Sequence, residues 1–82
     1  MNAQDLSELI AKFLTEKAHE LKIYYSYKVI KIDGQYEVSI SDSEQQLVAR
    51  RYLEEDIAYK AIILKDTDSI NILITRFIPG AK

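Results

Sequence analysis

The dipeptide Asp33-Gly34 lies between two segments in which apolar and polar residues alternate, "YKVIKI" before it and "QYEVSIS" after it. A two-residue type I′ turn needs a positive φ at both central positions, and Asp-Gly is one of the dipeptides that favour it. Alternation with a period of two is typical of half-buried strands. The sequence therefore predicts an antiparallel hairpin over residues of about 23–42.

The turn also predicts which residues face each other. With a two-residue loop, Val29 lies opposite Val38 and Tyr27 lies opposite Ile40. A three-residue loop with Gly34 in the left-handed region would shift one strand by one residue and exchange its faces. We expect the two-residue loop, because it gives the cleaner apolar face. The members of that face are Ile23, Tyr25, Tyr27, Val29, Tyr36, Val38 and Ile40, with Lys31 as the single polar residue.

Two helices are predicted beside the hairpin. The first covers residues of about 4–21, with Asn2 as a possible N-cap, because its apolar residues follow the 3–4 spacing of one helix face. They are Leu6, Leu9, Ile10, Phe13, Leu14, Ala18 and Leu21, with Lys17 on the same stripe. The second covers residues of about 43–57, since "SEQQ" resembles a capping box and an apolar stripe follows it. That stripe consists of Val48, Ala49, Tyr52, Leu53 and Ile57.

The last third of the chain has two interpretations. "AYKAIILKDTDSINILITRFI" favours a second hairpin or strand over residues of about 59–78, with a turn near residues 65–69. Alternatively, the second helix continues to Lys65 and only residues 70–78 form a strand. A short run of apolar residues does not separate a buried strand from a helix by its period. We expect the hairpin, because Ile70, Ile72 and Ile74 alternate.

These elements predict an α+β fold in two layers. A mainly antiparallel sheet of three or four strands is covered on one face by two helices, in the order αββαββ, or αββαβ if the second helix is long. The 82 residues are enough for one domain, so residues 1–82 are expected to form a single domain.

The amino-acid composition argues against several classes of protein function. Eleven basic and thirteen acidic residues give a net charge of −2, which argues against broad charge-driven binding to DNA. The absence of cysteine excludes disulfides and thiol chemistry and favours a reducing compartment. No segment has the pattern of a signal peptide, and no apolar run approaches the ~20 residues of a membrane span. We expect a cytoplasmic protein without membrane contact.

Residues suited to catalysis are few. The single histidine, His19, lies on the polar side of the first predicted helix with Glu16 and Glu20. The acidic run 54–56 is explained by a solvated helix face. The segment "DTDS" at 66–69 is explained by the preference of Asp, Thr and Ser for turns, and it lacks the glycine and the distal glutamate of a calcium loop. Two glycines do not suffice for a phosphate-binding loop. We expect no catalytic residue, no metal site, no cofactor and no enzyme activity.

The second face of the hairpin carries the best candidate site. Apolar residues there are expected to be partly exposed and to form a contact patch. The predicted interface residues are Tyr24, Lys28, Ile30 and Ile32. The sequence therefore favours a non-catalytic interaction or regulatory module of the adaptor or inhibitor type. We expect a homodimer, or a complex with another protein, through the outer sheet face or a sheet edge.

The alternative is a nucleic-acid-binding protein. Sheets that bind RNA stack bases on aromatic side chains and hold phosphates with neighbouring cations. The candidate contacts for this function are Tyr24, Lys28, Arg50 and Arg51.

Overall fold

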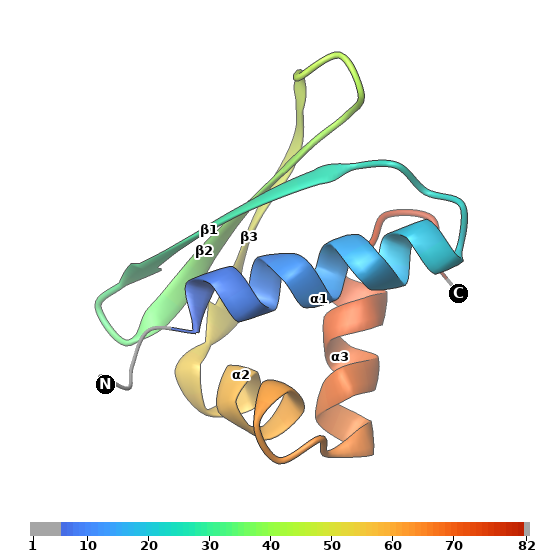
Figure 1. The fold of residues 1–82 in the computed structure, drawn as a ribbon. Coiled ribbons are helices and arrows are strands. Elements are labelled where there is room, and N and C mark those ends of the chain that lie inside the picture. Colours follow the sequence, from blue (N-terminus) through green and yellow to red (C-terminus); the bar gives the residue numbers. More distant parts are fainter. Residues whose placement is uncertain (1–5, 82) are drawn as a thin grey trace.

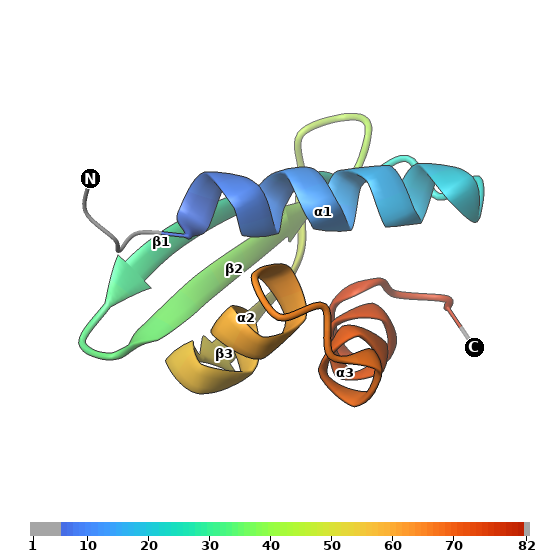
Figure 2. The ribbon, with the colours of Figure 1, turned by 60° about the horizontal axis from the view of Figure 1, so that its bottom comes forward.

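The computed structural model describes residues 6–81, which form an αβββαα fold. The elements are α1 (Ser7–Glu20), β1 (Ser26–Ile32), β2 (Gln35–Ser41), β3 (Leu47–Glu54), α2 (Glu55–Ile62) and α3 (Thr67–Phe77). The strands form one antiparallel sheet in the order β1-β2-β3, and the helices lie on one side of it (Figures 1 and 2). The α+β class and the small antiparallel sheet are confirmed, whereas the predicted orders αββαββ and αββαβ are confirmed only for their first three elements.

The first hairpin has the predicted register. Val29 lies opposite Val38, and Tyr27 lies opposite Ile40. Asp33 and Gly34 form the turn with φ angles of +44° and +81°. Both angles lie in the left-handed region that a two-residue hairpin turn requires. The local turn thus decides which face of β2 meets the helices.

The predicted helix over residues 43–57 is wrong up to residue 54, because residues 47–54 form β3, and only residues 55–57 are helical, as the start of α2. Asp42 closes a short turn instead, since its Oδ1 accepts hydrogen bonds from the backbone N–H groups of Glu44 (2.9 Å) and Gln46 (3.0 Å). The backbone N–H of Asp42 donates to the carbonyl of Gln46 across 2.9 Å. β3 then pairs with the second side of β2, where it satisfies the backbone groups of that strand within the protein.

The predicted strand or hairpin over residues 59–78 is also wrong, because α2 and α3 occupy this region. The carboxylate of Asp66 caps α3 by accepting hydrogen bonds from the N–H and the hydroxyl of Ser69, at 3.0 and 2.9 Å. Leu73 and Phe77, four residues apart, are fully buried. Packing at helical spacing therefore overrides the strand preference of the isoleucines.

The first helix agrees with the prediction within the described residues. α1 covers Ser7–Glu20, and Ile10, Leu14 and Ala18 are buried. The predicted positions 4 and 5 and the proposed N-cap Asn2 lie outside the described residues. The backbone N–H of Leu6 donates to the hydroxyl of Tyr36 across 3.2 Å, which joins the start of α1 to the middle strand.

The core lies between the helices and the inner face of the sheet, which we define as the face toward the helices. β2 alternates strictly, with Tyr36, Val38 and Ile40 buried and the residues between them half-buried. Each helix adds a buried stripe: Ile10, Leu14 and Ala18 of α1, Ala58, Ala61 and Ile62 of α2, and Leu73 and Phe77 of α3. Within residues 6–81, no helix has the length and apolar character needed to cross a membrane.

Candidate functional site

The side of the sheet away from the helices, the outer face, is not covered by any described element (Figures 1 and 2). Strand pairing arranges its side chains in four rows across β1, β2 and β3. The rows are Ile32, Gln35 and Glu54, then Ile30, Glu37 and Tyr52, then Lys28, Ser39 and Arg50, and, beyond the register shift between Ile40 and Ser41, Ser26, Ser41 and Leu47. The strands therefore place apolar and charged groups side by side on one open surface.

Large apolar residues are exposed on the outer face. Ile30, Ile32, Tyr52 and Leu47 have exposed fractions of 43%, 39%, 47% and 53%. Ile30, Ile32 and Tyr52 occupy the two rows nearest the Asp33-Gly34 turn, whereas the cations Lys28 and Arg50 occupy the third row and Leu47 the fourth. The outer face thus has an apolar part next to a basic row.

Polar contacts hold the side chains of β3 and β2 together. The hydroxyl of Tyr52 donates to Oε2 of Glu37 across 3.1 Å, and this hydrogen bond is the main reason that the pKa of Tyr52 is raised. The guanidinium of Arg50 lies 3.6 Å from the same carboxylate oxygen and donates to Oγ of Ser39 across 3.4 Å. Glu37 therefore contacts two exposed side chains of β3.

Three of the predicted interface residues share the outer face, namely Lys28, Ile30 and Ile32. Tyr24 does not lie on a strand. Its ring packs on His19 at the end of α1, with 5.1 Å between the ring centroids. Tyr24 therefore lies beside α1, because β1 begins only at Ser26 and the strand alternation does not extend back to it.

The four predicted nucleic-acid contacts do not form one surface. Lys28 and Arg50 share an outer row, on either side of Ser39. Arg51 follows Arg50 along β3, so its side chain points to the inner face, opposite Val38. Together with the position of Tyr24 beside α1, this leaves two of the four residues on the outer face.

Sequence reasoning missed Tyr52 and Glu54 as members of the outer face. Tyr52 and Glu54 were assigned to a helix, so their alternation with Leu53 was not used. The segment "RYLE" has the period of a half-buried strand, and that signal could have identified them.

The acidic run 54–56 joins secondary-structure elements. The carboxylate of Glu54 lies 3.2 Å from the guanidinium of Arg76 on α3, and that of Glu55 lies 2.7 Å from Nζ of Lys31 on β1.

The carboxylate of Asp66, in the segment "DTDS", caps α3. The hydrogen bonds that it accepts from the N–H and the hydroxyl of Ser69 lower the pKa of Asp66. Residues 6–81 contain no group of three or more His, Cys, Asp or Glu side chains that could hold a metal ion.

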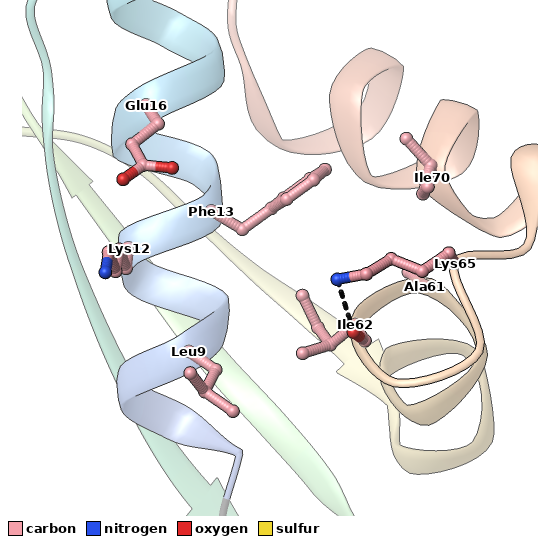
Figure 3. Close-up of a pocket in the computed structure, with 8 residues that line it drawn as sticks. All are labelled: Leu9, Lys12, Phe13, Glu16, Ala61, Ile62, Lys65 and Ile70. Atoms are coloured by element: carbon pink, nitrogen blue, oxygen red, sulfur yellow. Dashed lines mark hydrogen bonds between the residues drawn. The ribbon is translucent and has the colours of Figure 1, made fainter.

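A shallow groove lies between α1 and the α2–α3 pair (Figure 3). Leu9, Phe13, Ile62 and Ile70 line it, and Lys65 lies at its margin with Nζ donating to the carbonyl of Ile62 across 3.2 Å. Its volume of about 180 Å³ is below the ~300 Å³ at which pockets for small molecules begin. The groove therefore does not support a small-molecule site.

Comparisons with known proteins add no functional information. No family model, no curated protein and no solved structure matches this chain.

Proposed function

We propose that this chain is a small, non-catalytic protein-interaction module of the adaptor or inhibitor type that self-associates through its sheet. The observation that carries the proposal is the outer face, where Ile30, Ile32 and Tyr52 are exposed together on an uncovered surface. Exposed apolar groups that gather on one surface mark contact sites in monomeric domains.

The small size of the domain supports self-association. A chain of about 80 residues buries only about 60–65% of the surface that its unfolded form exposes. A second copy covers more apolar surface and raises the stability by mass action. The sheet offers its outer face and its two edge strands, β1 and β3, for this contact.

Sedimentation equilibrium over a wide range of protein concentrations tests self-association. We expect a monomer–dimer equilibrium whose dimer fraction grows with concentration. The Ile30→Glu variant locates the contact, because a carboxylate in the centre of a face-packed interface abolishes the dimer, whereas an edge contact is retained. A chain that sediments as a monomer at all concentrations would contradict self-association.

Nucleic-acid binding is the second candidate, because the structure brings Lys28 and Arg50 into one row of the outer face. The carboxylate of Glu37 lies 3.6 Å from Arg50 and already partly neutralises that cation. Binding to phosphates is governed by uncompensated positive charge and falls steeply with salt. Fluorescence anisotropy with mixed RNA and DNA pools at low salt is the test, and an unchanged signal excludes this function.

A further inference from the structure

The two edge strands of the sheet differ in charge. β1, "SYKVIKI", contains two lysines and no carboxylate, so pairing with itself forms no ion pair between the strands. Lysines on an edge strand are a common device against such pairing. β3, "LVARRYLE", contains Arg50, Arg51 and Glu54 and can form ion pairs with a second copy of itself. The β3 edge is therefore the better candidate for contact between copies.

On the edge of β3 away from β2, every second residue has its backbone N–H and C=O groups free for a further strand. In a two-residue hairpin, the pair that flanks the turn, here Ile32 and Gln35, exchanges hydrogen bonds, and the pattern alternates from there. Counted across the sheet, Leu53 and Arg51 direct their N–H and C=O groups toward β2. Arg50 and Tyr52 direct both groups outward, and Glu54 directs its N–H outward, whereas the C=O of Glu54 belongs to α2 because Glu54 is the N-cap residue of that helix.

The side chains select a register for two antiparallel β3 strands. A two-fold axis at Arg50 or at Arg51 places identical arginines opposite each other, and like charges opposite each other destabilise strand pairs. An axis at Tyr52 places Arg50 of each copy opposite Glu54 of the other and the two Tyr52 side chains opposite each other. An axis at Leu53 pairs residues 52–54 only, because α2 begins at Glu55. Among these registers, only the one at Tyr52 places opposite charges opposite each other over more than three paired residues.

We propose that a second copy of this chain adds to the β3 edge with its two-fold axis at Tyr52, so that residues 50–54 of the two copies pair and the sheet becomes six-stranded. This inference rests on the proposed self-association and names its surface. The side chains of Arg50 and Glu54 are 50% and 58% exposed, so both are accessible to a partner. The contact of Glu54 with Arg76 is an exposed ion pair and that of Arg50 with Glu37 is a partly exposed one at 3.6 Å, and pairs of this kind contribute little.

The dimer has a consequence for the outer face. Because the axis is perpendicular to the sheet, all helices lie on one side and the two outer faces join into one surface. Ile30 and Ile32 lie on β1, two strands away from the new contact, and remain exposed in the dimer. The dimer therefore doubles the apolar surface that is available to a different protein.

Charge reversal tests the register. In Arg50→Glu and in Glu54→Arg, each taken alone, both cross-strand pairs become repulsive, and we expect the dissociation constant of the dimer to rise about tenfold or more. A mixture of the two variants forms a heterodimer, because residue 50 of one then has the opposite charge to residue 54 of the other. The double variant Arg50→Glu/Glu54→Arg restores the homodimer. Sedimentation measures all four samples, with circular dichroism as the check of folding.

A second measurement distinguishes a dimer that forms through the β3 edge from one that forms through the outer face. The chain has no cysteine, so Tyr52→Cys and Ile30→Cys each introduce a single thiol. Directly opposed residues in a hydrogen-bonded pair have Cα atoms about 5.5 Å apart, which a disulfide spans. We expect oxidation to cross-link Tyr52→Cys and not Ile30→Cys, and we expect Ile30→Glu to remain a dimer.

Three results overturn the inference in distinguishable ways. A wild-type chain that is monomeric at all concentrations removes the proposed self-association together with this surface. A dimer that Ile30→Glu abolishes retains self-association but assigns it to the outer face. A dimer in which the mixed variants do not associate and the double variant stays weak excludes the Tyr52 register.

Discussion

The hydroxyl of Tyr36 accepts a hydrogen bond from the backbone N–H of Leu6 across 3.2 Å and thereby ties the first helix to the middle strand of the sheet. The side chain of Tyr36 is 1% exposed, so water does not replace this bond when it is lost. The pair links residues that are 30 positions apart in the chain.

We expect Tyr36→Phe to lower the free energy of unfolding by about 1–3 kcal/mol, because the substitution leaves a partly buried N–H group without its acceptor. Urea titration followed by circular dichroism measures the change. Tyr24→Phe is the matched control, since Tyr24 is 60% exposed, and we expect a change within about 0.5 kcal/mol. Equal effects of the two substitutions would contradict the importance of the Leu6–Tyr36 bond.

The same substitution of isoleucine by valine is expected to lower the free energy of unfolding by different amounts on the two faces of the sheet. Ile40 is fully buried on the inner face, whereas Ile30 is 43% exposed on the outer face. Removal of one methylene group by Ile40→Val is expected to lower the free energy of unfolding by about 0.5–1.5 kcal/mol. Ile30→Val is expected to change it by less than about 0.5 kcal/mol. Urea titration of both variants at one low protein concentration is the test, and a larger effect at Ile30 would refute the assignment of faces.

The cap of α3 predicts a pH-dependent stability. Hydrogen bonds from Ser69 lower the pKa of Asp66 from 3.8, so the ionised carboxylate stabilises the fold above that value. This stabilisation is lost as the pH falls through the lowered pKa, because protonation weakens the cap. We expect Asp66→Ala to lower the urea midpoint near neutral pH, and the difference from the wild type to shrink in acid.

Asp68→Ala is the control for the cap. Asp68 also lies in the first turn of α3, where it interacts with the helix dipole. Its loss removes a similar charge but not the bonds to Ser69, so the expected decrease in the urea midpoint is smaller. A difference between wild type and Asp66→Ala that does not depend on pH would contradict the cap assignment.

Tyr27 predicts a loss of stability in alkali. Burial, with a smaller contribution from Tyr25, raises the pKa of Tyr27 from 10.0 to about 12. Because the folded protein disfavours the phenolate, the stability is fully present below pH 10 and falls as the pH rises toward 12. We expect Tyr27→Phe to lose less stability over this interval than the wild type does.

The same variant has an expected effect at neutral pH. The hydroxyl of Tyr27 is buried and has no hydrogen-bond partner among the described residues. Its removal by Tyr27→Phe relieves the cost of taking a hydroxyl out of water, so the urea midpoint is expected to stay equal or to rise. A clear decrease in the midpoint would show that the hydroxyl has a partner in solution.

The first hairpin could be predicted from sequence because its determinants are local. The positive φ angles of Asp33 and Gly34 and the alternation of apolar residues decide the register and the faces together. The amphipathic helix α1 was predicted for a similar reason, since its buried residues repeat at one helical spacing. The assignment of Lys28, Ile30 and Ile32 to one outer face followed directly from that register.

The second half of the chain carries patterns that suit two structures. Ala49 and Leu53 are four residues apart, which fits a helix face, and they are also an even number apart, which fits a strand face. Pairing with β2 decides between the two structures, because residues 47–54 satisfy the backbone groups on the second side of β2 when they form a strand. Tyr52 and Arg50 joined the outer face as a result.

By itself, the sequence determined the α+β class, the first helix, the first hairpin and its faces, because local turn chemistry and periodicity suffice for them. Only the tertiary structure decided that residues 47–54 form a strand and that the isoleucine-rich segment forms α3. In α3, burial of Leu73 and Phe77 against the common core outweighs the strand preference of the β-branched residues beside them. Only the tertiary structure therefore identifies the side chains that lie on the β3 edge.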